Sequence, residues 1–204
     1  MDSSNPIDGM GELLHHGTCM VVPNTSTNRD RLRSVSIIEE YPFSLYELSY
    51  VNPLRDKYNI YVPQAGALDA KRRTIEVVLG PLRMATKRPF KILSGGGYDP
   101  VWKDEQRQLV VSHRPSTRSH HQYMPWTQGT KAGRYASGTA IDFRPSNINE
   151  RRDSYVYRLK EMSGAVLKEH GVHISIGVYM PGRGNFIHVD LRTGKKWRAT
   201  RRPK

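Results

Sequence analysis

The stretch that decides the fold is residues 133–144, which read GRYASGTAIDFR. From residue 139 onward apolar and polar side chains alternate, which is the period of a β-strand with one buried face. The predicted faces are Thr139, Ile141 and Phe143 on one side and Ala140, Asp142 and Arg144 on the other. Asp142 therefore places a carboxylate, a metal-ligating group, on the face turned away from the core.

A second strand near the C-terminus repeats this arrangement. In NFIHVDLR (185–192), Ile187 and Val189 are expected to face the core, and His188 and Asp190 share the opposite face. Histidine and aspartate are both zinc ligands. A single histidine on a strand is more often held by hydrogen bonds than by a metal. This pair alone therefore does not decide between a zinc site and a hydrogen-bonded histidine.

The elements around these strands predict an α+β protein. Ser44 and Glu47 form a capping-box pattern at the start of a helix in residues 43–48. Residues 69–88 carry a helical apolar stripe, which Pro81 should kink or restart. FKIL (90–93) and HISIGVYM (173–180) are predicted strands. Helices first, followed by strands around a helix, favour a mostly antiparallel sheet flanked by helices.

Residues 150–170 are predicted to form an amphipathic helix. The side chains expected to face the core are Tyr155, Leu159, Met162, Val166 and Leu167. Their spacing follows the 3.6-residue helical period.

Changes in amino-acid composition along the chain divide it into an arm, a domain and a tail. Residues 1–40 are rich in Ser, Asn, Thr and Gly and are predicted to form an extended arm with little structure of its own. Residues 41–198 form the domain, which carries a long polar insert at 99–134, and residues 199–204 end a basic tail. An insert of this length is typical of a functional or interaction element.

The charge is strongly positive, with 32 Lys and Arg against 19 Asp and Glu, and it favours acidic partners. Seven of these cations lie in the last thirteen residues, where we expect contacts with nucleic acid or another acidic partner: Arg192, Lys195, Lys196, Arg198, Arg201, Arg202 and Lys204. The alternative for this tail is a solvated segment that aids solubility.

Several classes of protein are disfavoured by composition. The only cysteine, Cys19, excludes an internal disulfide framework and a multi-cysteine metal site. No apolar run reaches the ~20 residues of a membrane span. The N-terminal sequence lacks the basic start and apolar middle of a secretory signal, so a cytoplasmic origin is expected, in a host cell or as part of a virion.

Five motifs in order resemble the zinc D-alanyl-D-alanine carboxypeptidase family, whose fold is shared with the Hedgehog signalling domain. FSLYEL (43–48) and VVLGPLR (77–83) resemble two of its helices. FKILSGGGYDP (90–100) stands where the family has I-x-S-G-Y-R-x-P, and residues 133–144 stand at S-x-H-x-x-G-x-A-x-D. GVYMPGRGNFIHVDLRTGKKW (177–197) resembles the closing G-x-Y-P…F-V-H-x-D…W. The branch most similar to this chain is common among phage and murein endopeptidases.

The resemblance implies a zinc site that is incomplete. It assigns two zinc ligands, Asp142 and His188, and a supporting role beside His188 to Asp190. The first family histidine is replaced by Tyr135, and Asp99 follows SGGGY where the family has a substrate-binding arginine. A phenol must lose a proton of pKa ~10 before it binds a metal, so we expect either no zinc or weakly bound zinc.

Three functions remain open at this point. The first is a catalytically impaired member of the family that serves as a structural or binding component of a phage or virus particle and contacts other subunits. The second is an active zinc-dependent peptidase that acts on peptidoglycan, and the third is a basic nucleic-acid-binding protein. The histidines of the insert, His113, His120 and His121, are interpreted as coincidental features of an exposed loop. The alternative is that one of them folds over the site and supplies the missing ligand.

Overall fold

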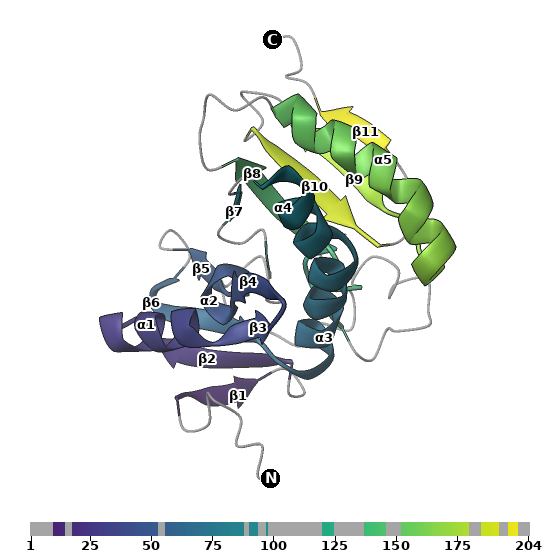
Figure 1. Ribbon diagram of the computed structural model, residues 1–204. Helices are drawn as coiled ribbons and strands as arrows, with labels where there is room; N and C mark the ends of the chain where they lie inside the picture. Colours follow the sequence, from purple (N-terminus) through teal and green to yellow (C-terminus); the bar gives the residue numbers. More distant parts are fainter. Residues whose placement is uncertain are drawn as a thin grey trace.

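The computed structural model describes residues 10–14, 18–52, 56–87, 90–93, 97, 120–124, 137–145, 152–179, 185–191 and 196–199. Figure 1 shows two sheets connected by one long helical segment that crosses between them. The four-stranded sheet contains β1 (Glu12–Leu14), β2 (Cys19–Pro23), β6 (Asp56–Pro63) and β5 (Tyr50–Asn52), in that order. All of its neighbouring strands are antiparallel.

The five-stranded sheet carries the residues that the sequence singles out. Its order is β11 (Lys196–Ala199), β9 (Ser175–Tyr179), β10 (Phe186–Asp190), β8 (Ile141–Pro145) and β7 (Phe90–Ile92). Every pairing is antiparallel except that between β11 and β9. The structure therefore confirms an α+β architecture with mostly antiparallel sheets.

The strand alternation read from the sequence is confirmed in β8 and β10. Ile141, Phe143, Ile187 and Val189 are completely buried and belong to the main hydrophobic core. Helix α5 (Arg152–His170) contributes Tyr155 and its neighbours to the same core. The opposite face of β8 and β10 is therefore the one on which polar side chains gather.

The long helical segment begins as α3 (Ala65–Thr74), continues through a π-helical turn (Ile75–Leu79) and ends as α4 (Gly80–Thr86). Pro81 lies in the first turn of α4, directly after the π-helical turn. The Gly80 N–H donates to the Ile75 carbonyl, which is the wider π spacing. The predicted restart at Pro81 is confirmed.

Helix α2 (Leu45–Leu48) and the hairpin that precedes it are stabilised by capping and by contacts of Arg83. The helix begins with the predicted capping box between Ser44 and Glu47, which is confirmed. It follows the hairpin of β3 (Ser36–Ile38) and β4 (Tyr41–Ser44). The Arg83 guanidinium lies 3.7 Å from the ring centroid of Phe43 and donates to the Phe90 carbonyl at 3.1 Å. Arg83 thereby attaches α4 to β4 and β7.

The prediction that residues 1–40 form an arm with little structure is wrong for residues 18–40. This segment contains β2, the helix α1 (Ser26–Ser34) and β3. Val22 and Leu32 are completely buried in the same core cluster as the five-stranded sheet. The boundary at residue 41 consequently does not separate an arm from a domain. Low apolar content misled the prediction, because a few buried side chains suffice to dock a polar helix.

Burial, strand pairing and the described ranges bear on four further predictions. In α5, Tyr155, Leu159 and Val166 are buried and Met162 packs against the core, but Leu167 is 40% exposed, so its assignment to the core is wrong. The backbone of residues 196–199 forms β11, so this part of the basic tail is paired as a strand. Most of the insert, including His113, lies outside the described residues. In the part of the chain described, no helix has the length and apolarity of a membrane span.

Replacing Leu32 tests whether α1 belongs to the core. We expect Leu32→Ala to lower the free energy of unfolding by about 2–5 kcal/mol, because it removes a fully buried side chain and leaves a cavity. Thr27→Ala, at an exposed position in the same helix, is the matched control and should change stability little. Chemical denaturation measures both values. Equal, small effects would mean that α1 is dispensable for the fold.

Candidate metal centre

Asp142 and His188 lie directly opposite each other on neighbouring strands. The register of β8 and β10 pairs these two residues, which brings their side chains onto one face. His188 Nδ1 is 2.7 Å from Asp142 Oδ1. The two ligands assigned from the sequence are thus adjacent in space, and each is largely shielded from solvent.

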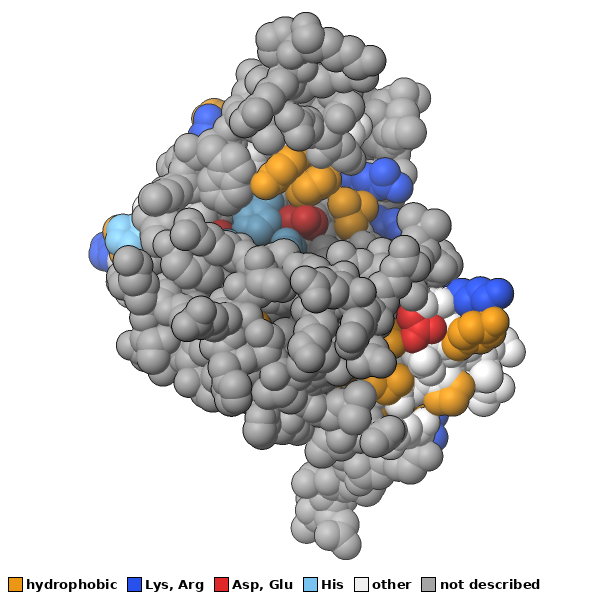
Figure 2. Space-filling view, turned by 180° about the vertical axis from the view of Figure 1, so that it is seen from behind, with side chains coloured by type: hydrophobic (Ala, Val, Ile, Leu, Met, Phe, Trp, Pro, Cys, Tyr) orange, Lys and Arg blue, Asp and Glu red, His pale blue; other side chains and the backbone are white. Residues whose placement is uncertain are grey.

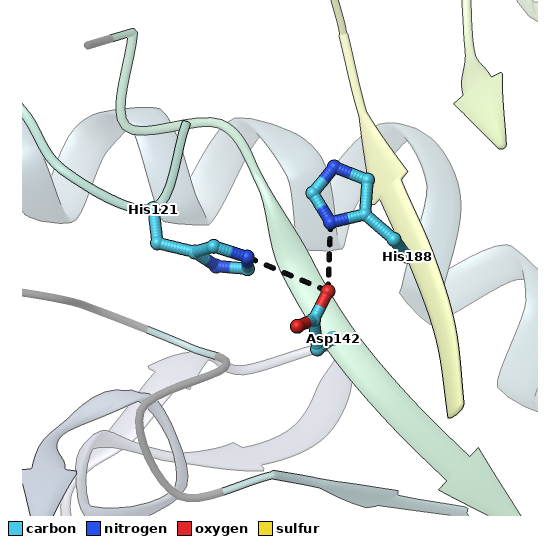
Figure 3. Close-up of side chains that lie close together, drawn as sticks. All are labelled: His121, Asp142 and His188. Atoms are coloured by element: carbon cyan, nitrogen blue, oxygen red, sulfur yellow. Dashed lines mark hydrogen bonds and ion pairs between the residues drawn. The ribbon is translucent and has the colours of Figure 1, made fainter. Parts of the chain in front are cut away.

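A third ligating side chain reaches this pair from the insert. His121 Nε2 lies 3.4 Å from Asp142 Oδ1, and its ring is 5.2 Å from that of His188 at an angle of 84°. Figure 3 shows the two imidazoles approaching Asp142 from different elements. One ligand atom from each of the three residues lies within 4.8 Å of the other two. The interpretation of the insert histidines as coincidental features of an exposed loop is therefore wrong for His121.

Main-chain pairing fixes the segment 120–124 beside β8. The Ala140 N–H donates to the His120 carbonyl at 3.1 Å, and Tyr123 forms an isolated antiparallel bridge with Ser137. Gln122 and Met124 are buried at 4% and 0% exposure. His121 thus projects from a docked segment, and its position relative to Asp142 is set by backbone hydrogen bonds.

Helix α3 holds both sides of this junction. The buried Lys71 ammonium donates to the Ala140 carbonyl at 2.6 Å and to the His121 carbonyl at 3.4 Å. Thr74 adds a hydrogen bond from Oγ1 to the Thr139 carbonyl at 2.7 Å. These bonds satisfy carbonyls at a place where an unpaired buried group would cost about 1–3 kcal/mol.

Two glycines make room for the ring of Tyr123. A Cβ on Gly66 would lie 2.4 Å from the Tyr123 hydroxyl oxygen, and one on Gly138 would lie 3.0 Å from its ring. Gly138 also has φ +75°, a conformation that favours glycine. The glycine of the quoted motif therefore accommodates the segment that delivers His121.

Asp190 completes the surroundings of His188. Its Oδ2 lies 3.1 Å from His188 Nε2, and its side chain is fully buried. An imidazole with its proton on Nε2 donates to Asp190 and leaves the Nδ1 lone pair facing Asp142. This is the arrangement by which a carboxylate orients a metal-binding histidine.

The charges of the site are strongly coupled. Burial raises the pKa of Asp142, but the neighbouring charges and hydrogen bonds of His121 and His188 outweigh it and lower that pKa to about 2. Burial lowers the pKa of His188, but hydrogen bonds to Asp142 and Asp190 outweigh it and raise that pKa from its ordinary value of 6.5. The site thus contains a stable carboxylate and an imidazole that readily accepts a proton.

The donor set fits a zinc ion. Two imidazoles and one carboxylate form a common catalytic zinc triad, and tetrahedral bonds of about 2.0–2.2 Å separate ligand atoms by roughly 3.3–3.6 Å. The 3.4 Å between His121 Nε2 and Asp142 Oδ1 lies in that range, and the 2.7 Å between Asp142 and His188 needs only a small opening. His121 Nδ1 is buried with no hydrogen-bond partner among the described residues, so the ring is positioned by its own main chain and by the contact of Nε2 with Asp142.

The other predicted residues fall into three groups. His120, next to His121, is not part of the three-residue cluster. Outside the described residues lie Tyr135, Asp99, His113, Arg192, Lys195, Arg201, Arg202 and Lys204. Lys196 and Arg198 are described only through the backbone of β11. Figure 2 shows histidine and acidic side chains reaching the surface together, with hydrophobic and basic side chains beside them.

Sequence reasoning named His121 among three histidines but gave no means of choosing it. The only local signals are two adjacent histidines followed by Gln122, Tyr123 and Met124. Comparison with known proteins adds no assignment: no family model, curated protein or solved structure matches the chain.

The zinc content of purified variants tests whether His121, Asp142 and His188 bind zinc and the adjacent His120 does not. We expect about one zinc per chain, lost in His121→Ala, Asp142→Ala and His188→Ala because each removes one of the three candidate ligands found among the described residues. His120→Ala is the matched control and should keep its zinc. Elemental analysis after dialysis against a weak chelator measures the ratio. Zinc that survives His121→Ala would contradict the assignment of this residue.

Zinc affinity should fall in acid. Below the raised pKa of His188 a proton occupies the imidazole that the metal needs, so affinity should drop about tenfold per pH unit. Asp190→Asn removes one cause of the raised pKa and should shift the onset of this drop to lower pH. It should also weaken binding by about 10–100-fold at neutral pH. Competition with a chromogenic chelator from pH 5 to 8 gives both values, and identical profiles in the two proteins would argue against this coupling.

Proposed function

We propose that this chain is a zinc-dependent peptidase of the D-alanyl-D-alanine carboxypeptidase type that acts on peptidoglycan peptides. In this proposal His121 supplies the ligand that the family carries at the position of Tyr135. The observation that supports it is the cluster of His121, Asp142 and His188. The Hedgehog-like fold is part of the proposal, supported by the order of the five motifs and by the antiparallel sheet that carries two of the ligands.

Three protein ligands are typical of catalytic zinc, whereas structural zinc sites use four. When bound in this way, zinc provides a Lewis acid and keeps one position for water or substrate. The residues of this chain have distinct tasks: His121, Asp142 and His188 hold the ion, and Asp190 fixes the tautomer of His188. Figure 2 shows histidine and acidic side chains at the surface, where a substrate could reach them.

The substrate class follows from the resemblance and from charge. The formal net charge of +13 favours approach to an anionic cell wall. The impaired, structural interpretation depended on two losses, that of the ligand at residue 135 and that of the substrate-binding arginine, whose place Asp99 takes. A histidine from the insert now stands beside Asp142, which answers the first of these two losses. A role in nucleic-acid binding depends on tail side chains, so the centre itself does not favour it.

Turnover decides between an active and an impaired protein. We expect the zinc-loaded protein to release D-alanine from muropeptides that end in D-Ala-D-Ala, or to cut their cross-links. Activity should fall to background in His121→Ala and His188→Ala, because each loses a zinc ligand. His120→Ala should stay close to wild type, and liquid chromatography of the digests measures all four proteins. Stoichiometric zinc with no turnover would support a binding module that has kept its metal.

A further inference from the structure

A second row of side chains runs across the five-stranded sheet next to the metal-ligand row. The register of the strands places Tyr179 opposite Phe186, and Lys91 opposite Arg144. Because Ile187 is opposite Phe143 and His188 is opposite Asp142, the next pair in this ladder places Phe186 across from Arg144. The row therefore reads Tyr179, Phe186, Arg144 and Lys91 across β9, β10, β8 and β7.

This row lies on the same face of the sheet as the candidate zinc ligands. Side chains two positions apart on a strand share a face, which relates Arg144 to Asp142 and Phe186 to His188. Two residues of a strand span about 6.6–6.8 Å. The row is thus one side-chain step from the metal centre, and hydrophobic and basic side chains accompany the histidine and acidic ones in Figure 2.

The row combines an aromatic half with a cationic half. The rings of Tyr179 and Phe186 are stacked, with centroids 4.2 Å apart and planes inclined by 13°, and both are half-buried. Lys91 and Arg144 are exposed. Among the described residues, no acidic side chain forms an ion pair with either cation.

The pairing of Lys91 with Arg144 carries an energetic cost. Like charges directly opposite each other on neighbouring strands repel and destabilise the pair. An anion between them would relieve this repulsion and would gain charge-assisted hydrogen bonds from both groups. The two cations therefore fit a ligand carboxylate better than they fit a role in stabilising the sheet.

We propose that Arg144 and Lys91 bind a carboxylate of the peptide substrate, while Tyr179 and Phe186 pack against its apolar part. This proposal rests on the proposed zinc peptidase function. One extended residue spans about 3.3–3.6 Å, so a carboxylate one residue beyond the bond at the metal lies between the two rows. The long side chains of Arg144 and Lys91 can approach that position. The row would make the enzyme selective for peptides with a free carboxyl end.

Binding of an acid and its amide tests the proposal without turnover. The probes are the acetylated dipeptide D-Ala-D-Ala as free acid and as C-terminal amide, titrated into zinc-loaded protein by calorimetry or NMR. We expect Lys91→Ser/Arg144→Ser to weaken binding of the acid about tenfold or more and to leave the amide unchanged. Lys160→Ser/Arg158→Ser changes the net charge equally at exposed positions of α5 and should leave both unchanged.

The outcomes separate this proposal from the proposed function. Equal loss of acid and amide, or no loss of either, would overturn the carboxylate assignment even if zinc binding and turnover are present. Equal weakening of acid binding in the α5 control would also overturn it, since it would show a non-specific charge effect. Absence of zinc and turnover would instead overturn the proposed function, while a preference for the acid that depends on Arg144 and Lys91 would still support the carboxylate site.

Discussion

The buried ammonium of Lys71 is the contact on which the candidate centre depends. Its Nζ donates to the carbonyls of His121 and Ala140, which belong to segments 50 and 69 residues away from Lys71 in the chain. A buried charge is tolerated only when hydrogen bonds compensate its loss of hydration. Lys71 therefore requires both segments to be in place, and together they require helix α3 to pack where it does. The geometry of the centre is in this way tied to the fold itself.

The proposed move of a zinc ligand from residue 135 to residue 121 has a simple spatial explanation. The segment 120–124 runs antiparallel to residues 137–140, as the Tyr123–Ser137 bridge shows. A side chain on this neighbouring segment can approach Asp142 from beside β8, so a metal ligand need not lie upstream on the same strand. Spacing along the sequence is only one of several ways to bring three ligands within 4.8 Å.

The features that the sequence predicts depend on contacts between residues close together in the chain. The features that it does not predict depend on contacts between residues far apart in the chain. Alternation in β8 and β10, the Ser44–Glu47 capping box and the restart at Pro81 are local, and the sequence predicts each of them. The docking of Leu32 and the approach of His121 depend on contacts with residues distant in sequence, which no local pattern encodes. The prediction that Leu167 faces the core failed for a related reason. Leu167 continues the apolar stripe of α5, but it lies at a position that the core does not cover.

Because alternate residues of a strand point to opposite faces, the core residues and the candidate site residues of β8 and β10 lie on different sides of the sheet. In β8, Ile141 and Phe143 enter the core, while Asp142 and Arg144 turn to the opposite face. In β10, Ile187 and Val189 likewise enter the core, while Phe186 and His188 lie on the opposite face. A shift of one residue in either register would exchange the two sets, which the loss of core burial strongly opposes. The hydrophobic core thus fixes the position of each polar side chain on the outer face, so the alignment of the candidate zinc ligands with the aromatic and cationic row is a consequence of core packing.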